Sequence, residues 1–401
     1  MNERLISLLG LIAFIGCGYL LSVNRRGIRW STVLWGIGLQ LILAFLILKT
    51  SVGLTLFQFL GDLVRQFLDF SDAGAKFIFG DGFEEHFIAF KVLPTIIFFS
   101  AFISLLYHYK ILPRVVAALG GVMMRSMKTS GAESLSCAAN IFVGQTEAPL
   151  LIKPYLSTLT MSELHAVMTG GFATIAGGVM AAYIAFGIPA EHLIAASVMS
   201  APAALAMAKI FYPETAKPET KGKIEVKVEG VYTNAIDAIT TGALDGLKLA
   251  LNVGAMLIAF LGLLALLNGV LGWMGGRIGL PQLSLEWILS YLMFPFAWLM
   301  GIPLADCLSV GILLGKKVIL NEFIAYLDLK EMIPTLSERT TIIATYALCG
   351  FSNLGAIGIQ IGGLSAIAPK RQQDLAVLGL RAMIAGSLAC FLTACVTGIL
   401  L

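Results

Sequence analysis

Charged side chains are scarce in this 401-residue chain: Asp, Glu, Lys and Arg make up 13% of it, whereas soluble domains carry about 25%. So few charges cannot cover a folded chain of this size, which excludes an ordinary soluble enzyme. The 27 Lys and Arg nearly balance the 24 Asp and Glu, so no basic field supports nucleic-acid binding. A hydrophobic fraction of 58% excludes disorder as well.

The chain also lacks the patterns that build metal centres and disulfide frameworks. Its six cysteines form no CxxC pair, and its four histidines are scattered. Most of these cysteines lie in apolar stretches, where we expect them to be small buried hydrophobic side chains. No GxxxxGK[ST] motif is present, which disfavours an ATP-driven pump.

Long apolar runs are what the sequence does contain. A bilayer core of about 30 Å takes about 20 apolar helical residues. Eight runs of that order carry little or no charge: 5–23, 30–48, 92–109, 166–188, 193–208, 249–276, 340–368 and 382–401. They predict an all-α polytopic membrane protein. The first run is longer than a usual signal-peptide core and the basic cluster follows it, so we expect a retained helix.

Basic side chains gather in loops that the positive-inside rule assigns to the cytoplasm. They are Arg25, Arg26 and Arg29, the Lys and Arg residues between 110 and 128, five lysines at 209, 217, 221, 223 and 227, and Lys370 with Arg371. The acidic balance of 51–85 fits the outer side. These loops agree if eight runs cross and both termini lie outside. The 209–229 stretch is a linker near the middle of the chain.

Two motifs place a carboxylate where the bilayer disfavours charge, which makes each a candidate site. The first is GQTEAP at 144–149, and the second is NEF at 321–323. Glu147 and Glu322 are 175 residues apart, and so are the Ser-Glu pairs at 162–163 and 337–338. The Thr-x-Ser-Glu and Thr-Leu-Ser-Glu segments, which begin at Thr160 and Thr335, predict helix starts.

The matching positions indicate two repeats, and the loop charges give them opposite orientations. Inverted repeats with interrupted apolar segments are typical of secondary transporters with a site at the midplane. Unwound backbone beside Asn140 and Thr174 would form an oxygen-rich shell suited to a hard cation such as sodium. Gln145, Thr146 and Asn353 offer donors and acceptors for a base edge or a sugar hydroxyl, and Phe351 offers a ring contact.

Each of these residues also has an ordinary structural alternative. Either carboxylate alone could be a loop residue that the predicted topology misplaces. Asn140 and Thr174 could serve as helix-packing hydrogen-bond partners, and Phe351 could be a core residue. Two carboxylates at matching positions in two repeats are harder to explain in this way.

Taken together, the motifs resemble the concentrative nucleoside transporter family, in its bacterial, sodium-coupled branch. The resemblance is carried by GQTEAP at 144–149, NEF at 321–323 with Ala325 and Tyr326, and CGFSNL at 349–354. LNVGAM at 251–256 and APKR at 368–371 extend it over nearly the whole chain.

The resemblance implies a homotrimer of elevator-type protomers, each with eight transmembrane helices and two re-entrant hairpins arranged as inverted repeats. It divides the chain into N-terminal scaffold helices (1–109), a first transport repeat (110–208), a cytoplasmic linker (209–241), a scaffold helix (242–285) and a second transport repeat (286–401). Each transport repeat would comprise an interfacial helix, a hairpin and two transmembrane helices.

The resemblance also assigns roles to individual residues of this chain. The substrate contacts it implies are Gln145, Thr146, Glu147 and Val179 toward the nucleobase, and Glu322, Phe351 and Asn353 toward the ribose. The sodium ligands it implies are Asn140, Thr174 and the backbone carbonyls of Val143 and Ile175. Gly355 and Ala356 stand where the family often has a serine, which removes one ribose contact.

We therefore expect a symporter, not an enzyme, with sodium as coupling ion and no other cofactor. Its substrates would be nucleosides such as uridine, cytidine and adenosine, imported through a bacterial inner membrane with both termini periplasmic. A proton-coupled symporter is the alternative, because the family has such a branch. A membrane-embedded hydrolase using Glu147 and Glu322, and a channel, are further alternatives, although no nucleophile–His pair supports the hydrolase.

Overall fold

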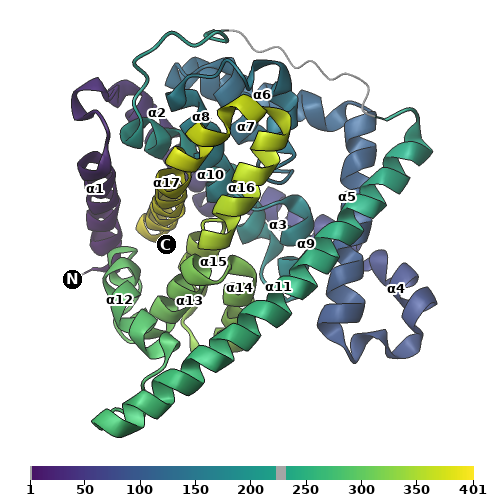
Figure 1. Cartoon of the computed structure of the whole chain (residues 1–401), viewed down its shortest axis with the longest axis vertical. Coiled ribbons are helices and arrows are strands. Elements are labelled where there is room, and N and C mark those ends of the chain that lie inside the picture. Colours follow the sequence, from purple (N-terminus) through teal and green to yellow (C-terminus); the bar gives the residue numbers. More distant parts are fainter. Residues whose placement is uncertain (1, 223–231) are drawn as a thin grey trace.

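A computed structural model describes residues 2–222 and 232–401, and every regular element within these ranges is a helix (Figure 1). The helices of the N-terminal half are α1 (Glu3–Leu21), α2 (Trp30–Lys49), α3 (Ser51–Asp69), α4 (Ser71–Phe79), α5 (Leu93–His108), α6 (Ile111–Met127), α7 (Gly131–Ala139), α8 (Met161–Ala173), α9 (Gly177–Ala185) and α10 (Ala190–Phe211). A π-helical turn, η3 (Phe87–Val92), leads into α5, and a 3-10 segment, η4 (Ala148–Tyr155), follows α7.

The C-terminal half begins with the longest helix, α11 (Ala235–Ile278). The helices that follow it are α12 (Leu285–Leu299), α13 (Cys307–Ile319), α14 (Glu322–Met332), α15 (Glu338–Leu348), α16 (Leu354–Ile367) and α17 (Gln372–Leu400). The all-helical prediction is therefore confirmed for the described residues.

Seven stretches within the described ranges are long and apolar enough to cross a membrane. They are Glu3–Leu21, Trp30–Lys49, Phe87–His108, Met161–Ala185, Ala190–Phe211, Ala235–Ile278 and Pro369–Leu400. These match seven of the eight predicted runs. The eighth predicted run, 340–368, corresponds to α15 and α16, which are two shorter helices.

Two of the predicted transmembrane helices are broken in the middle. The chain leaves helical geometry after α8 at Thr174, which is extended, and resumes as α9 at Gly177. It leaves α15 at Cys349 and resumes as α16 at Leu354. Neither break could be located from hydrophobicity, because the residues at both breaks are themselves apolar or small.

The two breaks touch each other. The backbone N–H of Phe351 in the second break donates to the carbonyl of Thr174 in the first, at 3.1 Å. Gly350 makes this approach possible, because a Cβ there would lie 2.7 Å from the Phe172 carbonyl oxygen. Unpaired backbone groups at the two breaks are thus partly satisfied by one another.

Helix caps confirm the predicted starts of the first halves of the broken helices. Thr160 and Glu163 form a complete capping box at the start of α8. In the second repeat the cap is Ser337 and not Thr335. Thr335 ends a short 3-10 turn, so helical geometry begins only after Leu336.

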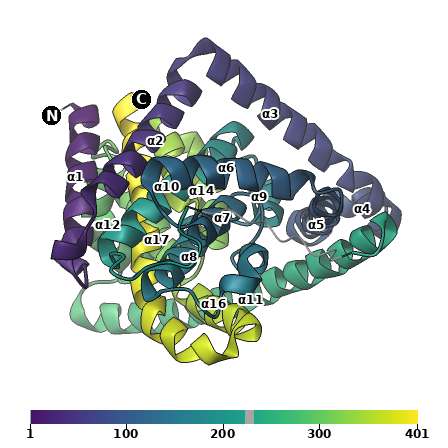
Figure 2. The ribbon, with the colours of Figure 1, turned by 90° about the horizontal axis from the view of Figure 1, so that it is seen from above.

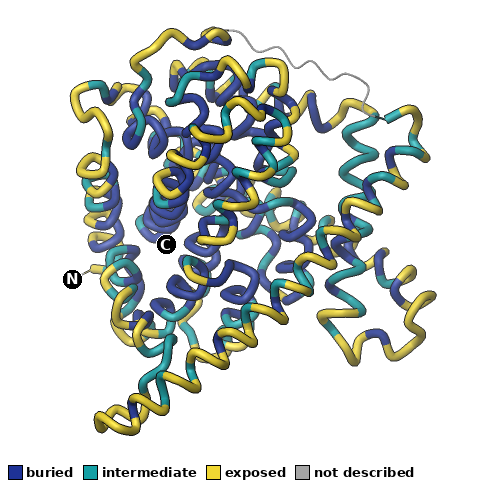
Figure 3. Tube along the Cα trace, in the orientation of Figure 1, coloured by how far each residue is buried: buried dark blue, intermediate teal, exposed yellow. Residues whose placement is uncertain are grey.

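The molecule consists of a largely buried body of helices and an outer pair, α5 and α11 (Figure 3). The central helices are buried over most of their length. In the most apolar part of α10, for example, 89% of the residues are buried. The long α11 crosses the molecule diagonally in Figure 1, and only 17% of the residues in its most apolar part are buried. It packs along α5, where Gly242 and Gly246 let the helices approach at Ser104 and Ser100.

The first two helices pack against the buried body. Gln40 on α2 donates to the Met199 carbonyl of α10 at 3.2 Å and to the Thr393 hydroxyl of α17 at 2.9 Å. Figure 2 shows α1 beside the C-terminal helix and α3 along one outer edge, with α5 and α11 on the same side of the molecule. The predicted scaffold segment 1–109 therefore contributes helices to both parts.

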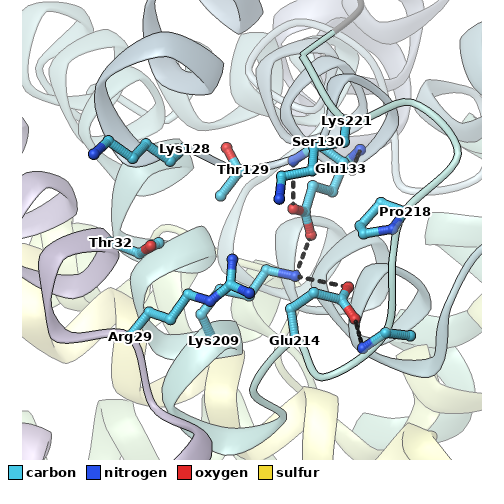
Figure 4. A pocket seen from close by; sticks show the side chains of 11 residues that line it. Arg29, Thr32, Lys128, Thr129, Ser130, Glu133, Lys209, Glu214, Pro218 and Lys221 are labelled. Carbon is cyan, nitrogen blue, oxygen red and sulfur yellow. Dashed lines mark hydrogen bonds and ion pairs between the residues drawn. The ribbon is translucent and has the colours of Figure 1, made fainter.

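The segment between α10 and α11 is shorter than the predicted linker, because α10 continues to Phe211. Lys209 lies in the last turn of α10, buried, and pairs with Glu133 at 2.6 Å and Glu214 at 3.8 Å (Figure 4). Buried carboxylates hold it there, so it is not the loop lysine that composition suggested. At its other end α11 begins at Ala235, within the predicted linker. Lys223 and Lys227 lie outside the described residues.

The first part of the linker covers the base of the first hairpin. The carbonyl of Thr220 accepts from Gly131 N–H at 2.9 Å, and its hydroxyl accepts from Ala132 N–H at 3.0 Å. Both donors are in the first turn of α7, whose N-terminal N–H groups lack partners within the helix. The linker therefore fixes the start of the hairpin that carries the first candidate motif.

Candidate functional site

Two hairpins present the candidate residues to the broken helices. The first hairpin consists of α7, the turn through 140–147 and η4. The second consists of α13, a tight turn at Leu320 and Asn321, and α14. Every residue of α7 is buried, as expected for a short helix at membrane depth that contacts protein and not lipid.

Glu322 lies at the tip of the second hairpin, in the first turn of α14, and is 4% exposed. The Asn321 side chain caps this helix by accepting from Ile324 N–H at 2.9 Å. Capping places the Glu322 carboxylate at the positive end of the α14 dipole. Among the described residues, no Lys or Arg side chain forms a salt bridge with this buried carboxylate, so the helix dipole is one source of its stabilisation.

Two side chains hold the Glu322 carboxylate from separate helices. The Tyr183 hydroxyl of α9 donates to Oε1 at 3.1 Å, and Asn353 Nδ2 donates to Oε2 at 3.0 Å. Asn353 also caps α16, because its Oδ1 accepts from Ala356 N–H at 2.8 Å. The predicted pair Glu322 and Asn353 is therefore brought together, at the junction of both broken helices with the second hairpin.

Tyr183 is a site residue that sequence reasoning missed. It is fully buried and stacks on Tyr326 of α14 with ring centroids 4.2 Å apart. The Tyr326 hydroxyl in turn donates to the Thr345 carbonyl at 2.7 Å. A tyrosine in an otherwise apolar run was the available signal, because a buried hydroxyl needs a partner.

Gln145 of the first hairpin also contacts a broken helix. Its Oε1 accepts from Gln360 Nε2 of α16 at 2.9 Å, and the same Gln360 nitrogen donates to the Met168 carbonyl at 3.0 Å. Gln145 and Gln360 are both buried. Gln360 was missed as well, although it is a rare amide within the apolar run 340–368.

Among the remaining substrate candidates, Thr146, Glu147 and Phe351 are more open, whereas Val179 is buried. Thr146 donates its hydroxyl hydrogen to Glu147 Oε1 at 2.9 Å, and Glu147 is exposed. Val179 on α9 is 2% exposed, and Phe351 is half-buried. Glu147 and Glu322 have separate partners: Glu147 accepts from Thr146 of its own hairpin, whereas Glu322 accepts from Tyr183 and Asn353 of the broken helices.

The predicted sodium ligands gather where α7 ends beside the first break. Asn140 caps the C-terminus of α7 and Thr174 that of α8, and each is 1% exposed. Asn140 Nδ2 donates to the Ser136 carbonyl at 3.0 Å, and the Thr174 hydroxyl donates to the Gly170 carbonyl at 2.8 Å.

The orientation of these two side chains leaves oxygen atoms for a ligand. Asn140 Oδ1 is buried and has no hydrogen-bond partner among the described residues. Ile175, which follows Thr174 in sequence, is fully buried, and Val143 is half-buried in the hairpin turn. A buried oxygen without a donor is costly unless a cation or water binds there, so the site fits a hard cation coordinated by neutral oxygens.

Comparisons with known proteins agree with this geometry. The family profile described as "Na+ dependent nucleoside transporter C-terminus" matches residues 192–398. The corresponding N-terminus profile matches 9–82, and a "Nucleoside recognition" profile matches 89–190. The three matched ranges include both hairpins and both breaks.

Curated relatives are similar over the whole of this chain. "Solute carrier family 28 member 3" of Homo sapiens is 47% identical over 415 residues, which is 100% of this chain and 60% of that protein. "Sodium/nucleoside cotransporter 1" of Mus musculus is 43% identical over 99% of this chain and 64% of that protein. The chain thus spans about 60% of the length of such relatives.

Solved structures match over nearly the full length of both chains. CNTnw in an inward-facing substrate-bound state is 40% identical, with a TM-score of 0.93 over 99% of this chain and 98% of that one. A variant of CNTnw in an outward-facing state gives a TM-score of 0.94, with 99% and 97% covered.

Paired hairpins and broken helices around buried polar side chains define the fold of an elevator-type secondary transporter. With the profile and structural matches added, the chain belongs to the Na+-dependent, or concentrative, nucleoside transporter family. The family resemblance seen in the sequence is confirmed.

Proposed function

We propose that this protein is a symporter that imports nucleosides and is driven by an inward sodium gradient. The observation that carries the proposal is the buried Glu322, held by Tyr183 and Asn353 where the second hairpin meets both broken helices. The names of its relatives, which include sodium/nucleoside cotransporters, support the same substrate and ion.

The geometry suits a ligand with a hydroxyl-bearing end and an amide-bearing end. Glu322 accepts hydrogen bonds from ribose hydroxyls, while Asn353 orients its carboxylate and Phe351 packs against the sugar. Gln145, Thr146 and Glu147 bind the polar edge of the base. A ligand without ribose hydroxyls leaves the buried Glu322 carboxylate with unpaired acceptor oxygens, which greatly lowers the affinity for that ligand. The site therefore discriminates nucleosides from ligands that lack the ribose hydroxyls.

Sodium binds at Asn140 and Thr174, with the carbonyls of Val143 and Ile175 as further ligands. The unpartnered Asn140 Oδ1 supports this assignment. Because Val143 and Gln145 belong to one turn, ion binding orders the segment that reads the base. Sodium therefore raises nucleoside affinity, and the nucleoside raises sodium affinity by the same factor.

We propose further that protomers associate as homotrimers and that the hairpin-bearing body moves against α5 and α11. Support comes from α11, which exposes large apolar side chains along its length, such as Leu251 at 61% and Ile258 at 79%. Such a face is suited to lipid or to another protomer. The loop charges support an outer location for both termini, and we propose a bacterial inner membrane, in which those termini would be periplasmic.

The function is tested by reconstitution into liposomes, with counterflow of labelled uridine under imposed sodium or proton gradients. Accumulation driven by sodium alone is expected. Accumulation driven only by protons would replace sodium with a proton as coupling ion. Equilibration without accumulation would indicate a channel, and chemical conversion of uridine would indicate an enzyme.

Substitution of the carboxylates tests the site. Glu322→Gln and Glu147→Gln are each expected to abolish uridine uptake, because a neutral amide accepts hydrogen bonds from the ligand less strongly than a carboxylate. Size-exclusion profiles in detergent should remain those of the wild type. Wild-type uptake by both variants would show that Glu147 and Glu322 are not substrate-binding residues.

A further inference from the structure

Lys317 is a fully buried cation at the end of the second hairpin's first helix, and the proposed function gives it no role. It lies in the last turn of α13 and is 0% exposed. Its Nζ donates to the Ala347 carbonyl at 2.8 Å. Within the described residues no carboxylate lies within 4.0 Å of it, unlike its neighbour Lys316, which pairs with Asp328 and Glu286.

Lys317 lies at a comparable point of the second repeat, where the first helix of a hairpin meets the first half of a broken helix. In the first repeat, α7 ends at Asn140 against α8, with Cys137 and Asn140 both close to Gly170. In the second, α13 ends against α15, through Lys317 and Ala347. Gly315, the residue 175 positions after Asn140, is in the same helical turn as Lys317.

The electrostatic setting favours a positive charge at this position. Ala347 is in the last turn of α15, where unpaired carbonyls and the helix dipole attract cations. The Lys317 charge also attracts the Glu322 carboxylate, which lies five residues further along the chain. The Lys317 charge also acts on the Cys349 thiol at the second break.

We infer that Lys317 is a fixed cation that takes, in the second repeat, the place that the mobile sodium ion takes in the first. This inference rests on the proposed function. Each hairpin then carries one cation beside its broken helix, one exchangeable and one covalently attached. Lys317 is a positioning residue: it keeps the Glu322 carboxylate charged and in place for the ribose.

Removal of the fixed charge should make a mobile cation necessary. In Lys317→Met, a side chain of similar length carries no charge, and Glu322 must move through the transport cycle with an added cation. We expect the number of charges moved per uridine to rise by one relative to the wild type. The half-saturating uridine concentration should rise at least about tenfold.

The number of charges moved per uridine, the charge-to-uridine ratio, is measured in liposomes at set membrane potentials. It follows from the potential that stops uridine flux at a known uridine gradient. One series varies sodium at constant pH, and the other varies pH at constant sodium. A steeper dependence on either ion identifies the added cation. Lys317→Arg keeps the charge and should retain the wild-type ratio, and Lys316→Met is the matched control for a lysine-to-methionine change in the same turn.

Active Lys317→Met protein with an unchanged ratio would overturn the inference. If that variant is inserted but inactive, thermal unfolding in detergent decides. Loss of either Lys317 or Glu322 leaves the other as a buried, unbalanced charge. The fall in Tm of the double variant, Lys317→Met with Glu322→Gln, should therefore be smaller than the sum of the falls in Tm of the two single variants. Additive falls would show that Lys317 only packs. The wild-type uptake is measured first, so failure of sodium-driven transport is distinguished from failure of the Lys317 role.

Discussion

At the scale of single residues, the site depends on side chains that serve two neighbours at once. Asn353 caps α16 with its oxygen and holds Glu322 with its nitrogen. Gln360 joins Gln145 to the Met168 carbonyl. Such residues link helix geometry to the candidate site, so a change in the backbone at the breaks is passed directly to the groups that we propose bind substrate.

The Tyr183 hydroxyl should matter for affinity more than for folding. Tyr183→Phe removes one donor to a buried carboxylate, a bond worth about 1.5–3 kcal/mol, so the uridine KM is expected to rise roughly tenfold or more. The matched control is Tyr346→Phe, since the Tyr346 hydroxyl is buried without a partner among the described residues. Equal KM values for the two variants would contradict this role.

The ion pair under the linker gives a second prediction at this scale. Lys209→Met leaves Glu133, which is 1% exposed, as an uncompensated buried charge, and should destabilise the protein by about 3–5 kcal/mol. Thermal unfolding in detergent measures the loss. Lys209→Met combined with Glu133→Gln should recover much of it, and no recovery would mean that the pair does not hold the hairpin base.

At the scale of elements, sequence reasoning located the helices better than it located their interruptions. Hydrophobic runs predicted eight spans, of which seven are long apolar helical stretches and the eighth is the pair α15 and α16; the family resemblance implied the two hairpins. Unwound backbone was expected beside Thr174, but residues 174–176 and 349–353 contain no Pro and no charge, so hydrophobicity alone does not give the bounds of either break. Contact between the repeats, through Thr174 and Phe351, is a long-range interaction that local patterns do not encode.

The structure brings only some of the predicted site residues into contact with one another. The motifs and the family resemblance pointed to Glu322 and Asn353, which the structure joins. Tyr183 and Gln360 were missed, because a single polar side chain in an apolar run has no periodic or spacing signal. Lys209 was misplaced, since loop charge counts treat every lysine as solvated, whereas Glu133 and Glu214 hold this one at the end of α10.

The contact between the breaks can be tested with glycine substitutions. Gly350→Ala places a methyl group 2.7 Å from the Phe172 carbonyl oxygen and 2.6 Å from Cys390 Sγ, so it should separate the breaks, lower the Tm and reduce uptake strongly. Gly362→Ala on α16 has open space around it and should leave the Tm unchanged or raise it slightly. Equal behaviour of the two variants would argue against a close approach at Gly350.

At the scale of the whole molecule, one chain combines a buried body with a peripheral helix pair. The body consists mainly of the two repeats with α1 and α2, and its central helices α8, α9, α10 and α17 are mostly buried. The pair α5 and α11 packs together through small residues and presents its outer surface to its surroundings. This division fits motion of one part against the other, since few buried polar contacts would have to break.

Helix α16 has a consequence for the ligand that follows from its two partners. Asn353 at its start holds the second hairpin, and Gln360 two turns later holds the first. Seven residues of helix extend about 10 Å. One rigid element therefore sets the distance between the sugar end and the base end of the site. A ligand with a longer or shorter connection between its two polar ends would lose one set of contacts, however well it matched the other.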